Sequence, residues 1–397
     1  MWEESVTSYL GRTFTTGQEM YDAGQLMMVP LHAAFTLNEK NWQQEFAGHF
    51  ARELPQFEAS AQDKKVEDRL GRLQYLYLSS RFLVLASQSG RQELIPSYMP
   101  TILYHEVERL WKKEAAWHWE HKPFAGGMKE RVMWKLSDAK TSKNYHKAIT
   151  DEELFLFAIA ADLRTYERET FGGAVESPVV TDVITVADKA FRKSVKFRGG
   201  GRWVFQPGVW SDHPDYLYAG RREKKPGMKP APVKDIAWDT SHSHRFPLWL
   251  LSLSQAHEKK STQRTFYESL RKGMEKQFYE HALIKPSRDF PAYRTTNFID
   301  GRNGIYRWGY QSLGANNGYG PYELSGTLLL GWWTFLDTDR IRDVYATMSR
   351  QLPSIASVAG IYNEPDAPRK QASIQQQMQL RELLMSLSNG IEVKLED

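Results

Sequence analysis

The stretch from Arg69 to Gln88 reads RLGRLQYLYLSSRFLVLASQ, and it is the clearest indication of the fold in this chain. Its apolar side chains recur at helical spacing, at Leu73, Leu76, Tyr77, Phe82, Leu83 and Leu85. An apolar density of this kind is typical of a helix that is buried among other helices. The chain is therefore expected to contain buried helices rather than only helices that lie on a surface.

Comparable apolar segments occur at residues 26–31, 154–161, 248–253 and 328–335, and more charged segments such as 106–113 and 262–276 lie between them. An inner ring of buried helices within an outer ring of amphipathic helices gives this alternation. We therefore expect a mainly α fold, an α/α barrel or toroid of helical hairpins with a few short strands in long loops. An open superhelical array is the alternative, although no fixed repeat period is visible.

The same periodicity predicts the remaining helices, and alternation predicts two short strand regions. The other predicted helices are residues 22–35 (broken or bent at Pro30), 41–54, 97–119, 151–171, 181–197, 241–256, 262–281, 322–336, 339–352 and 371–387. Residues 196–209 and 302–310 are the strand candidates. We expect a single domain over residues 1–397, with the loops 198–240 and 285–321 shaping a cleft.

Composition excludes several classes of protein. The absence of cysteine removes disulfides, thiolate metal sites and a cysteine nucleophile. No apolar run approaches the roughly 20 residues of a membrane span, and the first residues do not read as a signal peptide, although Met1 is compatible with an initiator on a trimmed chain. The net charge of +4 is dispersed, and the one dense basic cluster, residues 221–229, reads as a solvated loop, so nucleic-acid binding is not expected.

Two segments concentrate polar and aromatic side chains. Residues 238–251, WDTSHSHRFPLWLL, place polar groups at the mouth of a buried helix. Residues 297–333 are rich in Gly, Asn and Tyr and precede or open another. The candidate catalytic residues are His244, His242, Tyr319, Asn317, Arg245, Asp239 and Glu323, and the candidate substrate-binding residues are Trp238, Asp300, Arg302, Tyr306, Tyr310, Asn316 and Tyr322.

This combination of side chains suits carbohydrate. The chain has 13 tryptophans and 19 tyrosines, more rings than a helical core needs. Aromatic faces bind the C–H surfaces of sugars, and amides, carboxylates and arginine bind hydroxyl groups. Helix N-termini at the mouth of a barrel add positive potential, which favours an anionic substrate such as a uronic acid.

With this helical layout and an Asn, His, Tyr and Arg set, the chain resembles the α/α-toroid polysaccharide lyases of the alginate and heparin types. The resemblance implies β-elimination at a uronic acid in a polysaccharide or oligosaccharide, without a cofactor. It further implies that His244 (or His242) acts as base or neutraliser and that Tyr319 transfers a proton, with Asn317 and Arg245 around the carboxylate. A polysaccharide substrate favours a periplasmic or secreted protein, and the oligomeric state stays open.

Several alternatives remain. A glycoside hydrolase on the same scaffold would use two carboxylates, Asp239 and Glu323, with Asp300 in reserve. A non-catalytic carbohydrate-binding protein would use only the rings. The His-x-His of residues 242–244 beside Asp239 is compatible with a metal site, although we expect no metal. Asn317 is also explained by turn chemistry, one of the two histidines by helix capping, and Tyr306 and Tyr310 by packing.

Overall fold

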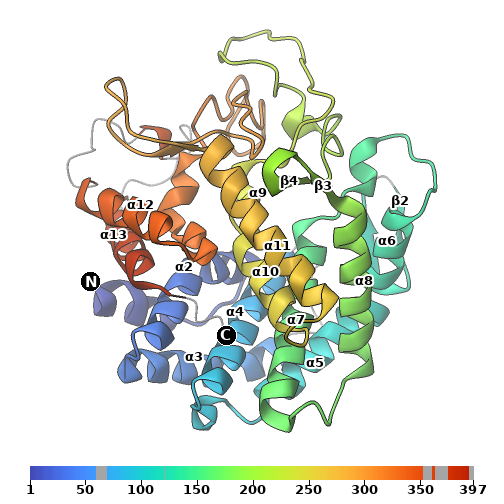
Figure 1. The fold of residues 1–397 in the computed structure, drawn as a ribbon, viewed down its shortest axis with the longest axis vertical. Coiled ribbons are helices and arrows are strands. Elements are labelled where there is room, and N and C mark those ends of the chain that lie inside the picture. The colour runs from blue at the N-terminus through green and yellow to red at the C-terminus, as the bar shows by residue number, and fades with distance from the viewer. Residues whose placement is uncertain (60–68, 120, 352–359, 363–373, 393–397) are drawn as a thin grey trace.

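The computed structural model describes residues 1–59, 69–119, 121–351, 360–362 and 374–392, and it is mainly helical (Figure 1). The α-helices are α1 Ser8–Leu10, α2 Gly17–Thr36, α3 Lys40–Ala59, α4 Arg69–Gln88, α5 Met99–Glu108, α6 Gly127–Leu136, α7 Asp151–Phe171, α8 Pro178–Ser194, α9 Thr240–Ser243, α10 Phe246–Gln255, α11 Thr262–Gln277, α12 Asp339–Gln351 and α13 Ile374–Gly390. The prediction of a mainly α protein is confirmed.

The most apolar helices lie side by side in the interior. Helix α2 packs against α4, α4 against α7, and α7 against α10. Helix α10 in turn packs against the short helical turn η11, Trp332–Leu336. Every residue of α4 except Leu70, Leu85 and Gln88 is buried, and so is nearly every residue of α10, because each of these helices has neighbours on most sides.

The more polar helices cover this interior group. Helix α3 packs on α2, α5 on α4 and α7, α8 on α7, and α11 on α10. Helices α12 and α13 pack against each other, and α13 also contacts α2 and the turn η10, Ser325–Leu330. Each covering helix presents an apolar stripe to the interior and a charged face to solvent, as in α11 and α12.

Most predicted helices are present with altered ends. The bounds of α4 and α7 are those expected from periodicity, and α2 continues past Pro30 to Thr36. The predicted helix 181–197 begins three residues earlier and ends at Ser194, where strand β3 begins. Helix α6 was not predicted, and residues 371–373 of the predicted last helix lie outside the described residues.

Two predicted helices are wrong in kind or in length. The helix expected over residues 97–119 ends with the π-turn η5, Arg109–Lys113, after which the chain turns into strand β1. The helix expected over residues 322–336 is two 3₁₀ turns, η10 and η11. Gly331 separates them with a φ of +80°, a left-handed conformation that interrupts an α-helix.

In the part of the chain that the structure describes, the strands form three short antiparallel hairpins, β1–β2 (Ala116–His118 and His121–Phe124), β3–β4 (Val195–Phe197 and Trp203–Phe205) and β5–β6 (Leu283–Ile284 and Arg294–Thr295). The β3–β4 hairpin falls in the predicted strand region 196–209, except that β3 begins one residue earlier, at Val195. Residues 302–310 form only an isolated bridge between Tyr306 and Tyr319. The long segments that follow β4 and β5 gather at one end of the molecule, at the top of Figure 1.

Candidate functional site

A cavity of about 220 Å³ opens where the interior helices meet the long loops. We call it the inner pocket, and its lining combines rings, carboxylates and two histidines. The lining residues are Leu70, Trp117, Trp119, Thr150, Asp151, Glu152, Trp210, His213, Asp215, Tyr216, Trp238, His242, Tyr306 and Arg307. They come from α4, the β1 hairpin, the start of α7, the segment after β4, α9 and the loop after β6.

Asp239 and His242 form a hydrogen-bonded pair under the pocket. Asp239 is the N-cap of α9 and accepts a hydrogen bond from the backbone N–H of His242 at 3.2 Å. The same spacing brings the imidazole over the carboxylate, with Nδ1 2.9 Å and 2.8 Å from the two carboxylate oxygens. The local sequence D-T-S-H thus both starts the helix and orients the ring.

The Asp239 carboxylate is completely buried and surrounded by donors. The hydroxyl of Tyr216 donates to it at 2.5 Å, and the hydroxyl of Ser241 donates as well. Burial alone would raise the pKa of Asp239, but His242 and these hydroxyl groups hold it well below its usual range. Asp239 therefore stays an anion that can stabilise positive charge on His242.

This arrangement fixes the tautomer of His242. Because Nδ1 faces a carboxylate, it carries the proton and donates it. The opposite nitrogen, Nε2, has no hydrogen bond to any residue that the structure describes, and the ring lines the inner pocket with about a quarter of its surface exposed (24%). His242 therefore presents a basic nitrogen to the pocket.

His213 has the complementary arrangement. Its Nδ1 accepts a hydrogen bond from the backbone N–H of Asp215 at 3.2 Å and caps the turn Pro214–Tyr216. Burial lowers the pKa of His213, and the carboxylate of Asp215, 3.9 Å away, opposes only part of that shift. The ring is thus neutral at pH 7 with its proton on Nε2, so His213 is a hydrogen-bond donor.

Among the described residues of the lining, Arg307 is the one Lys or Arg, and several contacts hold it. Its Nε donates to Asp215 at 2.9 Å, and its guanidinium centre lies 5.1 Å from the ring of Tyr306 and 4.6 Å from that of Tyr310. Although burial opposes the charge, Tyr306, Asp215 and Asp239 raise the pKa of Arg307. Its backbone has a φ of +55°, and non-glycine residues in this strained region cluster at functional sites.

The other two carboxylates of the wall are each engaged by a buried arginine. Asp151 accepts from Arg245 at 3.0 Å, and Glu152 accepts from Arg131 at 2.9 Å. Glu152 also accepts from the indole N–H of Trp117 at 2.9 Å. These interactions fix the start of α7 and the β1 hairpin in the wall.

Indole and phenol rings form a continuous aromatic wall. Trp117 packs edge-on against Trp119 at 5.1 Å, and Trp119 packs edge-on against Trp210 at 6.1 Å. Trp210 stacks on Tyr216 at 5.8 Å and meets Trp238 edge-on at the same distance. Rings that hold one another in this way are preorganised to bind a flat apolar face.

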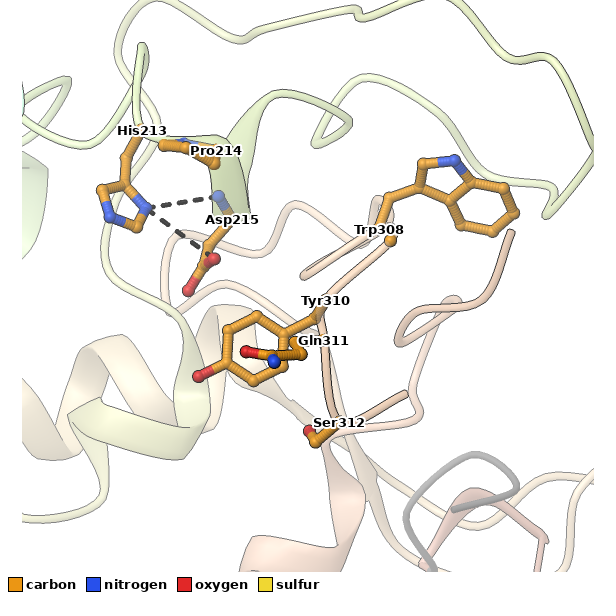
Figure 2. A pocket seen from close by; sticks show the side chains of 8 residues that line it. His213, Pro214, Asp215, Trp308, Tyr310, Gln311 and Ser312 are labelled. Atoms are coloured by element: carbon orange, nitrogen blue, oxygen red, sulfur yellow. Dashed lines mark hydrogen bonds and ion pairs between the residues drawn. The ribbon is translucent and has the colours of Figure 1, made fainter. Parts of the chain in front are cut away.

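A second cavity, which we call the outer pocket, adjoins the first. It measures about 670 Å³ and shares His213 and Asp215 with the inner pocket. Figure 2 shows His213, Pro214 and Asp215 on one side of it and Tyr310, Gln311 and Ser312 on the other. Trp308 and Gly309 complete its lining.

Four of the residues singled out from the sequence meet at the inner pocket. Trp238, His242 and Tyr306 line it, and Asp239 lies directly beneath His242. Tyr310 lines the outer pocket. The loops 198–240 and 285–321 both contribute residues to the two cavities.

The adjoining residues of the first segment lie in the interior. His244 is fully buried, packs edge-on against Trp332 at 5.5 Å and has its Nε2 3.3 Å from the side chain of Gln25. Burial lowers its pKa well below the usual value. Arg245 is also buried, and its guanidinium donates hydrogen bonds to Asp151 and to the hydroxyl oxygen of Tyr21.

The other candidates of the second segment hold loops together. Asn317 bonds to the backbone of Leu313 and Gly318, and Glu323 pairs with Lys224 at 2.9 Å. Asp300 and Arg302 pair with each other at 2.6 Å. The remaining three, Asn316, Tyr319 and Tyr322, line neither pocket; Asn316 and Tyr322 adopt a positive φ, and Tyr319 pairs through its backbone with Tyr306.

Sequence reasoning missed most of the inner pocket, namely Leu70, Trp117, Trp119, Thr150, Asp151, Glu152, Trp210, His213, Asp215, Tyr216 and Arg307. The sequence does contain a pattern that points to two sets of these residues, those in segments 207–220 and 116–119. The segment 207–220, PGVWSDHPDYLYAG, has the same mixture of rings, His and Asp as the candidate segment 238–251, and A-W-H-W at residues 116–119 is also rich in aromatic residues.

Comparison with known proteins adds no relative, since no family model, no curated protein and no solved structure matches this chain. Within the described part of the chain, no group of three or more His, Asp or Glu side chains is arranged to hold a metal ion. None of the described helices has both the length and the apolar character needed to cross a bilayer.

Proposed function

We propose that the protein is a carbohydrate-active enzyme that cleaves a uronic-acid polysaccharide by β-elimination at the inner pocket. The observation that carries the proposal is the Asp239–His242 pair. The basic Nε2 of His242 faces a cavity that is walled by tryptophans and also lined by Arg307. A buried carboxylate behind a histidine is a general-base arrangement, and aromatic walls suit sugar rings.

In this reaction a base removes the proton at C5 of the uronic acid. The electron pair forms the C4–C5 double bond, and the bond from C4 to the glycosidic oxygen breaks. His242 takes the proton on Nε2, and Asp239 stabilises the imidazolium that results. The imidazolium then returns this proton to the departing oxygen, so that one group serves both half-steps.

The C5 proton becomes acidic only if the substrate carboxylate is neutralised. Arg307 supplies a positive charge at the pocket, and the Nε2–H of His213 supplies a neutral donor. These two replace Asn317 and Arg245, which the sequence suggested for the role and whose side chains are engaged elsewhere.

The two alternative functions, a glycoside hydrolase and a non-catalytic binding protein, account for fewer of the groups at the inner pocket. The hydrolase pair named from the sequence is Asp239 and Glu323; Asp239 is buried beneath His242, and Glu323 pairs with Lys224 outside the pocket lining. A binding protein would need the rings but would not need a buried carboxylate that orients a histidine. These observations favour the lyase.

The α/α toroid is part of the same proposal. Its support is the order of packing, in which α2, α4, α7, α10 and η11 contact one another in sequence and α13 and η10 lead back to α2. The polar helices alternate with these along the chain and cover them. The inner pocket would then lie at the mouth of the ring.

A panel of polygalacturonate, alginate, hyaluronan and heparin tests the reaction, read for near-ultraviolet absorbance and for reducing ends. Elimination gives both signals, and hydrolysis gives reducing ends alone. The His242→Ala variant should lose about 10²–10⁴-fold in kcat. The control is His105→Ala, on the exposed side of α5. Full activity of His242→Ala, or no cleavage of any polymer by the wild type, contradicts the proposal.

A further inference from the structure

We propose that the outer pocket is a second sugar subsite, which binds the unit next to the one held in the inner pocket. The inference rests on the proposed function, because it assigns both cavities to one polysaccharide chain. It adds that the protein recognises at least two consecutive units and that the loop around Tyr310 provides the second contact.

The two cavities are arranged for one continuous ligand. His213 and Asp215 line both, so a chain that leaves the inner pocket past these side chains enters the outer pocket directly. Figure 2 shows Asp215 between His213 and the Tyr310 side of the cavity. Arg307 lies at the same boundary, since it pairs with Asp215 and stacks on both Tyr306 and Tyr310.

The volumes indicate how much ligand each cavity takes. Sites that enclose a whole drug-sized ligand measure roughly 300–1,000 Å³. The inner pocket, at about 220 Å³, falls below this range and suits a single sugar unit. The outer pocket, at about 670 Å³, falls within it. A polysaccharide has more units than the inner pocket holds, and the adjoining outer pocket has room for the next one.

The lining of the outer pocket matches a sugar in chemistry. Tyr310 and Trp308 provide rings, and Gln311 and Ser312 provide uncharged donors and acceptors. Tyr310 is 40% exposed, so its ring is accessible to a ligand in this cavity. These are the groups that bind the apolar face and the hydroxyl groups of a pyranose.

The loop that carries these groups is held in place before any ligand arrives. The N–H of Gly309 donates to Asn317 at 2.7 Å, and the N–H of Leu313 donates to Tyr310 at 2.9 Å. The Asn317 side chain closes the loop by donating to Leu313. Because Arg307 also stacks on Tyr310, the ring would lose little conformational freedom when it binds a sugar.

The test measures affinity against chain length in the His242→Ala background, where cleavage does not interfere. Units of one, two and four sugars from polygalacturonate, alginate and hyaluronan are titrated, and binding is followed by tryptophan fluorescence. From the polymer that binds best, we expect the four-unit chain to bind at least 10-fold more tightly than the single unit. Adding Tyr310→Ala should remove most of this gain, and Tyr310→Phe should keep it.

The control is Phe197→Ala, which removes an exposed ring from β3 outside both pockets and should leave the gain unchanged. Equal affinity for one and four units, or a gain that survives Tyr310→Ala, overturns the subsite. A gain with no cleavage by the wild type overturns the proposed reaction and leaves the subsite standing. Absence of binding by all nine sugars overturns the subsite, and cleavage of the polymer panel by the wild type then decides the proposed reaction on its own.

Discussion

Among single residues, the contacts of Asp239 carry the most consequence for chemistry. Its carboxylate accepts from Tyr216, Ser241 and His242 at once and is closed off from solvent. Each donor stabilises the anion, and the anion in turn fixes the proton of His242 on Nδ1. A change at Asp239 should therefore alter the base without changing the shape of the pocket.

We predict that Asp239→Asn lowers kcat by about 10²–10⁴-fold with little change in KM. Asparagine caps a helix as well as aspartate does, so α9 should keep its start. The amide is neutral, however, and its NH₂ group can turn the histidine to the tautomer that lacks a basic Nε2. Steady-state kinetics on the polymer cleaved by the wild type measure this. Activity within twofold of the wild type would show that the pair is only a helix cap.

Tyr216→Phe should lower kcat less than Asp239→Asn does. It removes one of the four groups that donate to the Asp239 carboxylate and leaves both contacts with His242 intact. We expect a loss of about 10-fold in kcat, on the scale of one hydrogen bond to a charged group. A loss as large as that of Asp239→Asn would instead place the phenol itself in the reaction.

His49 provides a residue-scale prediction on stability. The ring is buried in α3, with Nδ1 donating to the carbonyl of Leu10 at 2.8 Å and Nε2 accepting from Tyr75 at 3.1 Å. Burial lowers the pKa of His49 to about 4. The unfolded chain binds the proton near pH 6.5, so this group's contribution to stability is present above pH 6.5 and is lost as the pH falls to about 4.

The lost contribution is on the order of 3 kcal/mol. A His49→Gln variant keeps one donor and one acceptor but has no proton to bind. Its free energy of unfolding should therefore fall less than that of the wild type between pH 7 and pH 4, as measured by urea denaturation. Parallel curves for the two proteins would contradict the assignment.

The residue scale also explains which site predictions could be made. Asp239, His242 and Trp238 share one short segment, so local pattern was enough to find them. The sequence alone could not decide whether His242 or His244 faces the pocket. Residues two apart on a helix point about 200° apart, and only the packing of the helix decides which of them is turned toward the cavity. His213, Trp117 and Arg307 come from separate segments that only the tertiary fold brings together.

At the scale of elements, periodicity worked where packing is regular. Helices α4 and α7 have neighbours on most sides, and their apolar residues recur along most of their length, so their bounds could be predicted. The start of α7 is also marked by its acidic first turn, Asp151 to Glu153. Periodicity failed over residues 322–336, because an apolar run can also be folded as two 3₁₀ turns around Gly331. Only contacts with the rest of the chain decide between the two, and the sequence does not contain them locally.

Helices α4 and α7 are joined by a buried ion pair that gives a second prediction on stability. Arg81 donates to Asp162 at 2.7 Å, and both side chains are essentially inaccessible to solvent. We predict that Asp162→Ala destabilises the protein by about 3–5 kcal/mol, because it leaves the guanidinium buried without its partner. Urea denaturation measures the change in the free energy of unfolding.

Two comparisons make that measurement specific. Glu108→Ala breaks the Glu108–Lys113 pair, in which both side chains are exposed to solvent, and should cost less than about 1 kcal/mol. The double variant Arg81→Met with Asp162→Leu removes both charges and should recover much of the stability lost in Asp162→Ala. A double variant as unstable as the single one would mean that packing, rather than charge, is responsible.

At the scale of the whole molecule, the described helices share one hydrophobic core. It extends from Trp2 near the N-terminus to Ile391 near the C-terminus and includes buried residues of α2, α4, α7, α10 and α13. Helix α13 is joined to the interior by more than apolar contact, since the hydroxyl of Thr334 donates to the carbonyl of Ser388 at 2.7 Å. The proposed toroid, in which the ring of helices closes on itself, should unfold as one unit.

We therefore predict that a mutation in the last helix destabilises the entire molecule. Leu384 of α13 is fully buried, and Leu384→Ala should cost about 2–5 kcal/mol through lost burial and the cavity it leaves. In differential scanning calorimetry we expect a single transition for both the wild type and the variant. The transition of the variant should lie several degrees lower. If α13 were an independent appendage, a small early transition would separate from an unshifted main one. That result would argue against closure of the ring, because a toroid cannot lose the helix that leads back to α2 without exposing the side chains of α2 that α13 covers.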